Sequence, residues 1–155
     1  MIRRAEARDV PALLGLLEQV NLVHHLGRPD LFRLGTKYGP AELEALLADP
    51  LRPVFVWEDA DGRVLGHAFC VIREPVPEDR LLVPVRTLYI DDVCVDAAAR
   101  KRGIGGALCR CVKDYARSLG CHNVTLHVWA CNPEAETFYR NLGFKPQKIC
   151  LEEIL

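Results

Sequence analysis

Apolar residues recur at helical spacing in two stretches near the start of the chain, after a short strand expected at residues 2–5. The first helix is expected to follow a capping Asp9, with Pro11 in its first turn, because aspartate accepts hydrogen bonds from the free backbone N–H groups there and proline lacks one. The positions expected to be buried in this helix are Val10, Leu13, Leu14, Leu17 and Val20. Residues 21–39 break the spacing, so we expect a loop there. A shorter helix then begins at Pro40 and turns Leu43, Leu46 and Leu47 inward.

Runs of β-branched and aromatic residues next indicate three strands. These runs are residues 54–57, 64–72 and 85–95. Asp61 and Gly62, between the first two runs, are typical of a tight hairpin turn. Residues 73–84 contain three prolines among charged residues, so an irregular loop is expected before the third strand. Strands joined in this way predict an antiparallel sheet.

Beyond residue 95 the pattern changes to helices and strands in alternation. The expected elements are a helix up to residue 119, a strand at 124–129, a helix at 133–142 closed by Gly143, and a last strand within 144–155, through 148–154. A strand, a crossover helix and a further strand predict a parallel pair. We therefore expect one domain over residues 1–155, of mixed α/β class, with a mixed but mostly antiparallel central sheet flanked by helices.

A basic, glycine-rich turn joins the strand that ends at Val95 to the helix that follows. Its residues are Arg100, Lys101, Arg102, Gly103, Ile104, Gly105 and Gly106. Glycine lets a ligand approach the backbone closely, and the unpaired N–H groups and the dipole of a helix start favour an anion. The turn therefore predicts a cradle for a phosphate or pyrophosphate group.

The spacing of this turn separates three kinds of phosphate site. A P-loop needs Lys and Ser or Thr after its last glycine, and a dinucleotide-binding turn needs G-x-G-x-x-G directly after a strand; neither is present. The turn instead reads R-x-x-G-x-G, which resembles the acyl-CoA signature of the GNAT superfamily of N-acetyltransferases. A second stretch, C-N-P-E-A-E-T-F-Y-R-N-L-G-F, resembles that family's N-x-x-A-x-x-F-Y-x-x-x-G-F motif. Its matching residues are Asn132, Ala135, Phe138, Tyr139, Gly143 and Phe144.

This resemblance implies how acetyl-CoA would bind. In the GNAT fold two central strands splay apart, here residues 88–95 and 124–129, and the acyl-CoA inserts between them. The backbone of Val93, Cys94 and Val95 would pair with the amides of the pantetheine arm, and one N–H there would polarise the thioester carbonyl. The pyrophosphate would lie on the glycine-rich turn, while Asn132 and Tyr139 would contact the CoA. Asn132 is also expected to cap the helix at Pro133.

The resemblance also implies the groups that move protons. Asp91 and Asp92 stand just before the pantetheine strand, and a carboxylate there can take the proton of the incoming amine. Where the family has an acidic pair, the first member is often the base, so Asp91 is placed ahead of Asp92. Alternation sends the two side chains to opposite sheet faces, unless a bulge reverses the parity. The Tyr139 hydroxyl is expected to protonate the departing thiolate.

The acceptor side of the cleft is implied to lie between the first helix and the residues that follow it. The candidate residues are His24, His25, Arg28 and Tyr38, for which structural hydrogen bonding is the alternative role. His67 and His127 lie in expected strands and are interpreted mainly as packing or hydrogen-bonding residues. Cys131 lacks a partner motif that would make it a nucleophile.

The composition and net charge of the chain limit the kinds of partner that we expect it to bind. The net charge of the 155 residues is −1, which gives no strongly basic face for nucleic acid. Seven cysteines without C-x-x-C spacing indicate a reducing compartment, so a cytoplasmic location is expected. No apolar run has the length of a membrane span, and His and Cys show no zinc spacing, so neither a membrane nor a metal is expected. A homodimer stays open.

The function expected from these residues is an acetyl-CoA-dependent N-acetyltransferase. It would transfer the acetyl group to a primary amine of a small molecule or peptide by direct attack in a ternary complex. Two alternatives stay open, because the motifs concern CoA rather than the acyl group or the acceptor. The chain could be a catalytically silent module that binds or senses CoA, or it could transfer another acyl group.

Overall fold

The computed structural model describes residues 1–155 and contains five strands and four α-helices. The strands are β1 (Ile2–Arg4), β2 (Val54–Glu58), β3 (Val64–Arg73), β4 (Thr87–Val95) and β5 (Asn123–Leu126). The α-helices are α1 (Val10–Gly27), α2 (Pro40–Ala48), α3 (Ile104–Ser118) and α4 (Pro133–Asn141), with short 3-10 turns at Ala7–Asp9 and Ala97–Ala99. No helix is both long and apolar enough to cross a membrane.

The five strands form one sheet in the order β1-β2-β3-β4-β5. The first four strands pair antiparallel, and β4 and β5 pair parallel across the crossover helix α3. The predicted mixed, mostly antiparallel sheet is therefore confirmed. β5 is an edge strand, because it pairs with β4 alone.

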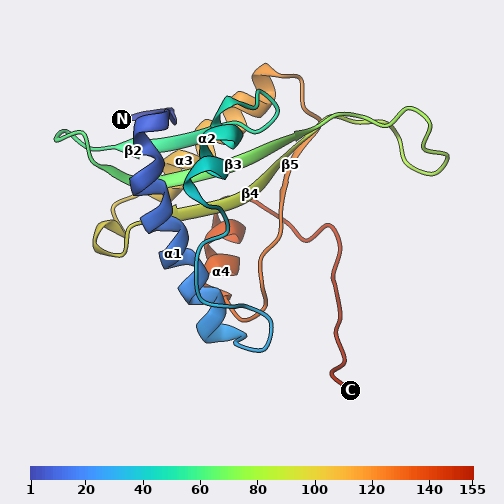
Figure 1. Cartoon of the computed structure of the whole chain (residues 1–155). Helices are drawn as coiled ribbons and strands as arrows, with labels where there is room; N and C mark the ends of the chain where they lie inside the picture. Colours follow the sequence, from blue (N-terminus) through green and yellow to red (C-terminus); the bar gives the residue numbers. More distant parts are fainter.

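Helices cover both faces of the sheet, and each face has its own apolar core (Figure 1). On one face α1 and α2 contribute Leu13, Leu17 and Leu43, which pack on Val56 and Phe69. On the other face α3 contributes Ile104, Leu108 and Val112, which pack on Ala68, Leu88 and Ile90. Apolar residues of neighbouring strand positions thus serve opposite cores, as the period of two in a strand requires.

Two predictions about the first helix are wrong. Residues 21–27 are helical rather than part of a loop, because no residue between Val20 and Gly27 breaks a helix. Asp9 does not cap this helix with its side chain. Its carboxylate instead accepts from the backbone N–H of Glu6 at 2.8 Å and forms an ion pair with Arg3 at 2.7 Å, so it fixes the preceding 3-10 turn to β1.

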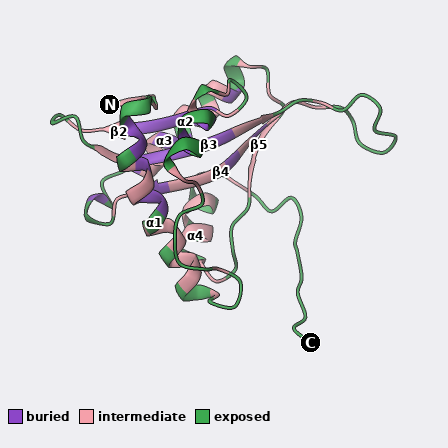
Figure 2. Ribbon diagram, in the orientation of Figure 1, coloured by how far each residue is buried: buried purple, intermediate pink, exposed green.

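Two predictions about the end of the chain also differ from the structure. β5 ends at Leu126, three residues earlier than expected. The predicted last strand is wrong, because residues 145–155 form no strand and are exposed (Figure 2). We call residues 145–155 the tail. Its residues have the composition of a strand, but no neighbouring strand in the chain pairs with them.

Candidate active site

A β-bulge in β4 brings the two adjacent aspartates to the same face of the sheet. In the register with β3, Cys70 pairs with Ile90 and Phe69 pairs with Asp92, so Asp91 has no partner. Ile90 packs in the core under α3, and Val93 packs against that same core. The parity of the strand therefore shifts between them, and both carboxylates face the side covered by α1 and α2. Simple alternation would have placed them on opposite faces.

The first aspartate is held by a loop far away in the sequence. Lys37 Nζ lies 2.6 Å from Asp91 Oδ2 and donates a hydrogen bond to it. The Tyr38 hydroxyl donates to the same oxygen at 3.3 Å and accepts from Arg52 at 2.9 Å. Asp91 is thus paired with a cation in the folded chain.

The second aspartate has a different environment. Burial raises the pKa of Asp92 to about 7, against the opposing charge of Lys37. Its Oδ2 lies 4.0 Å from Nε2 of His67, a fully buried side chain whose two ring nitrogens have no hydrogen-bond partner. Burial also lowers the pKa of His67 to about 3, so the ring is neutral at physiological pH. Asp92 is therefore a carboxyl group that exchanges its proton near neutral pH.

β4 is paired on both sides in its first half and on one side in its second half. Residues 87–90, the closed half, pair with both β3 and β5, and the pairing with β5 ends at Ile90 and Leu126. Residues 91–95, the open half, have register partners in β3 alone. The predicted splay of the two central strands is confirmed. Val93, Cys94 and Val95 lie in the open half, where backbone groups on the β5 side have no strand partner.

The glycine-rich turn lies at the end of the open half. Gly103 has a φ of +79° and immediately precedes α3, which begins at Ile104 as predicted. Lys101 is also left-handed, with a φ of 61°. The first N–H groups of an α-helix have no partner within it, so those at the start of α3 are free to meet an anion. Arg100 Nε donates to the carbonyl of Val95 at 3.3 Å, which ties the basic triplet to the end of β4.

Close packing at Gly105 places α4 beside this turn. A Cβ built at Gly105 would come within 3.2 Å of the Phe138 ring, so a larger residue would require that ring to shift. Asn132 accepts from the backbone N–H of Ala135 at 3.1 Å, which confirms its predicted role as the cap of α4. Tyr139 packs on Phe138 and Phe144, and burial raises the pKa of its hydroxyl. That hydroxyl has no hydrogen-bond partner in the chain.

Two of the four residues predicted for the acceptor side, His24 and Tyr38, belong to two separate groups of side chains. The His24 ring packs on Phe32 at a tilt of 32°, and the Phe32 ring meets Trp129 edge-on; the ring centroids in each pair are 5.0 Å apart. This aromatic row joins the end of α1 to the segment after β5. Tyr38 and, through it, Arg52 belong to the group around Asp91. Lys37 and Phe32 were not singled out from the sequence, where nothing distinguishes them from other loop residues.

The remaining predicted residues are engaged elsewhere. His25 Nδ1 lies 2.6 Å from the carbonyl of Phe32, and Arg28 binds two carboxylates, those of Asp30 and Glu152. His127 Nδ1 lies 3.1 Å from the Tyr89 hydroxyl. The Arg73 guanidinium lies over the Tyr89 ring, with its Cζ 3.8 Å from the ring centroid. Cys131 packs against Gly27, and a Cβ built at Gly27 would come within 2.8 Å of the Cys131 sulfur. No cluster of three or more His, Cys, Asp or Glu side chains is arranged to hold a metal ion.

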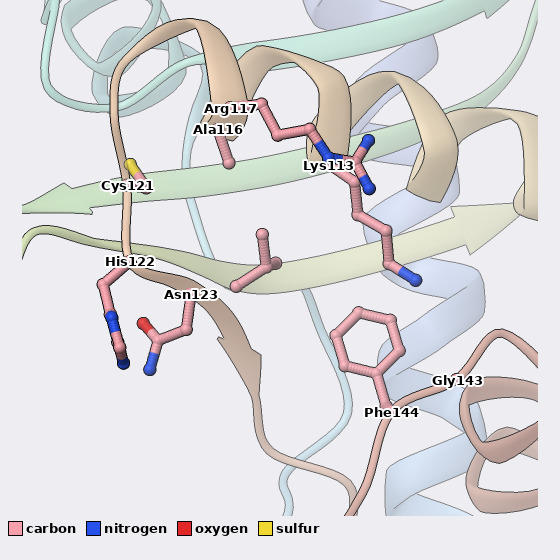
Figure 3. A pocket seen from close by; sticks show the side chains of 9 residues that line it. Lys113, Ala116, Arg117, Cys121, His122, Asn123, Gly143 and Phe144 are labelled. Carbon is pink, nitrogen blue, oxygen red and sulfur yellow. The ribbon is translucent and has the colours of Figure 1, made fainter.

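A pocket of about 300 Å³ lies at the outer edge of β5 and is separate from the splay (Figure 3). It is lined by Lys113, Ala116, Arg117, Cys121, His122, Asn123, Val124, Gly143 and Phe144. Lys113 crosses it with its Nζ 4.4 Å from the centre of the Phe144 ring and 2.6 Å from the carbonyl of Leu142. None of the predicted catalytic or CoA-binding residues lines this pocket.

Several known proteins with similar sequences or folds are acetyltransferases. The acetyltransferase (GNAT) family matches residues 20–144. Glucosamine 6-phosphate N-acetyltransferase 1 of Oryza sativa subsp. japonica is 36% identical over 149 residues, which cover 96% of this chain and 82% of that protein. The structure of a tetramutant of the BH1408 protein from Bacillus halodurans has a TM-score of 0.95 and 27% identity, over 100% of this chain and 99% of that one. The aminoglycoside N-acetyltransferase AAC(6')-Iy, solved in complex with CoA, shares the fold with a TM-score of 0.73 at 19% identity, over 100% and 98%.

Proposed function

The chain belongs to the GNAT family of acetyltransferases, and we propose that it transfers the acetyl group of acetyl-CoA to a primary amine of a small molecule or peptide, within a ternary complex. The observation that carries this proposal is the open half of β4. There an unpaired strand edge runs from two carboxyl groups at one end to a basic helix start at the other. We propose that residues 1–155 form one catalytic domain.

Acetyl-CoA would bind along this edge. The residues proposed to hold its pyrophosphate are Arg100, Lys101, Arg102, Gly103, Ile104, Gly105 and Gly106. The free N–H groups of the helix start and the three basic side chains both favour a phosphate there. The backbone of Val93, Cys94 and Val95 would pair with the pantetheine amides as a neighbouring strand does. This supports acetyl-CoA as a co-substrate, and Asn132 would border its thiol end beside Tyr139.

We assign the base role to Asp92 and a positioning role to Asp91. A primary amine arrives mostly as its ammonium form and must lose a proton before it attacks the thioester carbonyl. A group with a pKa of about 7 accepts that proton efficiently near neutral pH, which suits Asp92. Asp91 is paired with Lys37, so it holds the loop at residue 37 against β4. The neutral ring of His67 lies beside Asp92 and brings no positive charge that would lower the pKa of that carboxyl group.

The acetyl transfer then needs an acid for the leaving group. When the amine has attacked, the C–S bond breaks and the CoA thiolate leaves with the electron pair of that bond. The Tyr139 hydroxyl is proposed to donate a proton to this sulfur. Burial raises its pKa, so the hydroxyl carries its proton throughout the physiological range. The hydroxyl has no hydrogen-bond partner in the chain, which supports this role.

The acceptor is proposed to enter from the side of α1 and α2, where both carboxylates face. The row formed by His24, Phe32 and Trp129 offers aromatic surface there, and Lys37 and Tyr38 offer polar groups. Amines of small molecules and peptides both suit such an opening. We propose a cytoplasmic location, which the seven free thiols support, and a homodimer as the assembled form.

The test is the release of CoA thiol from acetyl-CoA in the presence of an amine panel. The panel contains glucosamine 6-phosphate, an aminoglycoside, and peptides with a free N-terminus or lysine. We expect acetyl transfer to at least one amine, checked by the mass of the product, and none without enzyme. Propionyl-CoA and succinyl-CoA are included to show the acyl preference. CoA binding without turnover on any amine would show a silent CoA-binding module instead.

A further inference from the structure

A lysine of the chain already holds its amine at the place where the acceptor is proposed to enter. Lys37 Nζ lies 2.6 Å from Asp91 Oδ2, and its positive charge also lowers the pKa of Asp92. Both carboxylates face the side of the sheet that α1 and α2 cover. Lys37 is the one lysine of the chain that forms an ion pair. The chain therefore supplies a primary amine of its own beside the proposed base.

The backbone around Lys37 is fixed, whereas its side chain is free to turn. Lys37 lies in the loop that connects α1 to α2 (Figure 1). Before it, the Asn21 side chain of α1 donates to the carbonyl of Arg33 at 2.8 Å. After it, the Tyr38 ring stacks on Phe69 of β3, with ring centroids 6.1 Å apart. The Lys37 side chain is 48% exposed, so no neighbouring group prevents a change of rotamer.

The amine of Lys37 is within reach of the proposed position of the acetyl group. Asp91 is the first residue of the open half of β4, and Val93 is the first residue proposed to pair with the pantetheine arm. Two residues of extended strand span about 7 Å. Rotation about the side-chain bonds of a lysine moves its Nζ over such a distance. An amine that starts at Asp91 therefore reaches a thioester bound along residues 93–95.

We propose that the domain acetylates its own Lys37, and that the transfer takes place within one chain. The inference rests on the proposed function, because it uses acetyl-CoA bound along the open half. The Lys37 ammonium gives one proton to Asp92, and its nitrogen then attacks the thioester carbonyl. The C–N bond forms, the C–S bond breaks, and the thiolate leaves with the electron pair of that bond. The thiolate takes the proton of Tyr139, the second proton of the nitrogen replaces it, and Asp92 releases its own proton to water.

The protonation of Lys37 matches that of an ordinary acceptor. Burial lowers the pKa of Lys37, but its hydrogen bond and ion pair with Asp91 raise it above the ordinary value. Lys37 is therefore an ammonium group at neutral pH and needs the base, as a free primary amine does. An amine held beside the site does not have to be captured from solution, which favours its reaction over that of exposed lysines. The product is a neutral amide, so the reaction occurs once per chain.

Acetylation of Lys37 removes the only positive charge near the proposed base. The ionisable groups near Asp92 are Lys37, His67, Tyr89, Asp91, Cys94 and Tyr139. Burial keeps the His67 ring neutral and keeps the proton on Cys94 and Tyr139. Without the charge of Lys37, the pKa of Asp92 rises above its value of about 7. The modified chain should therefore lose more turnover at pH 7 than at pH 9, which makes self-acetylation a brake on the site.

The test incubates the purified chain with isotopically labelled acetyl-CoA and no acceptor, and follows the mass of each lysine peptide. We expect one acetyl group at Lys37, added at least about tenfold faster than at the exposed Lys145 and Lys148. The rate should not depend on protein concentration, because amine and base belong to one chain. Asp92→Asn should slow it by about 10²–10⁴-fold. A chain that is already acetylated at Lys37 when purified supports the proposal if Asp92→Asn, purified alongside, is not.

A matched pair of variants separates this transfer from chemical acetylation by free acetyl-CoA. Gly103→Glu should abolish acetylation of Lys37, because it blocks the proposed pyrophosphate site. Gly62→Glu, which has the same φ of +79° far from the site, should leave it unchanged. Acetylation that is equal in the two variants would be chemical and would overturn the proposal. Turnover on the amine panel is measured with the same samples, and the parent is assayed at pH 7 and 9 before and after modification.

The panel distinguishes failure of this inference from failure of the proposed function. Turnover on an amine, with Lys37 unmodified or acetylated no faster than Lys148, overturns the inference and leaves the proposed function in place. The absence of both turnover and self-acetylation overturns both. A rate that rises with protein concentration overturns transfer within one chain. Equal loss of turnover at pH 7 and pH 9 in the modified chain overturns its proposed effect on Asp92.

Discussion

The two halves of β4 belong to one strand but differ in sequence and in surroundings. In the closed half, Leu88 and Ile90 are buried and the backbone pairs with β3 and β5. In the open half the backbone pairs with β3 alone, and the bulge turns Asp91 and Asp92 to one face. The closed half is a structural part of the sheet, whereas the open half leaves hydrogen-bonding groups free for a ligand.

The bulge and the splay occur at the same place, and together they define the site. An extra residue in one strand increases its twist and bends it, so the ladder with β5 ends where Asp91 begins. The same extra residue places two carboxyl groups together, where Lys37 pairs with one and burial raises the pKa of the other to about 7. The end of the pairing with β5 and the shared face of the two carboxyl groups thus both occur at one bulged residue.

The largest effect is expected where the open half ends, at the cradle. Gly103→Glu places a negative side chain where the pyrophosphate is proposed to lie, so binding of CoA should fall below detection by calorimetry. Gly62→Glu is the matched control, because Gly62 has the same φ of +79° in a hairpin far from the site. Both variants carry the same backbone strain and charge change. Equal CoA affinity in the two folded variants would show that the glycine-rich turn does not bind the pyrophosphate.

The next effect separates the two aspartates. Turnover of the parent should rise with pH up to about 7, because Asp92 must lose its proton to act as a base. Asp92→Asn should lower turnover by about 10²–10⁴-fold and remove that rise. Asp91→Asn should lower it less and keep the rise, since it removes only the partner of Lys37. If Asp91→Asn abolishes the pH dependence and Asp92→Asn does not, the base is Asp91.

The same residue is expected to weaken the fold above neutral pH. The folded-state pKa of Asp92 is raised above its ordinary 3.8, so between about pH 4 and 7 the folded chain keeps a proton that the unfolded chain has lost. Stability from this group is therefore lost as the pH rises through that window. Asp92→Asn should raise the free energy of unfolding at pH 8 by up to about 4 kcal/mol, and much less at pH 4. Denaturant titrations at both pH values measure this, and an equal change at both would contradict it.

A smaller effect is expected at Tyr139. Tyr139→Phe keeps the ring packed on Phe138 and Phe144 but removes the hydroxyl. Thiolate is a fair leaving group, so turnover should fall by only about tenfold to a hundredfold, with little change in the KM of the acceptor. Unchanged turnover in Tyr139→Phe, with chemistry limiting the rate, would leave Tyr139 a packing residue.

The parts of the site predicted from sequence are those built from neighbouring residues. The turn at Gly103 and the cap at Asn132 are local, so their spacing was sufficient to predict both. The contact of Lys37 with Asp91 joins residues 54 positions apart, and no local pattern indicates it. The shared face of Asp91 and Asp92 depends on a register that only the pairing with β3 determines. The tail was predicted as a strand from its local alternation, yet no strand of the chain pairs with it.

The most direct test of the central claim is amide hydrogen exchange with and without CoA, resolved at single residues by NMR. The open half of β4 is proposed to receive the pantetheine arm, and the closed half already has both neighbours. CoA should therefore slow exchange at residues 93–95 and 103–106 and leave residues 87–90 unchanged. Equal protection of the two halves, or protection confined to another part of the chain, would contradict the claim that the open half is the acetyl-CoA site.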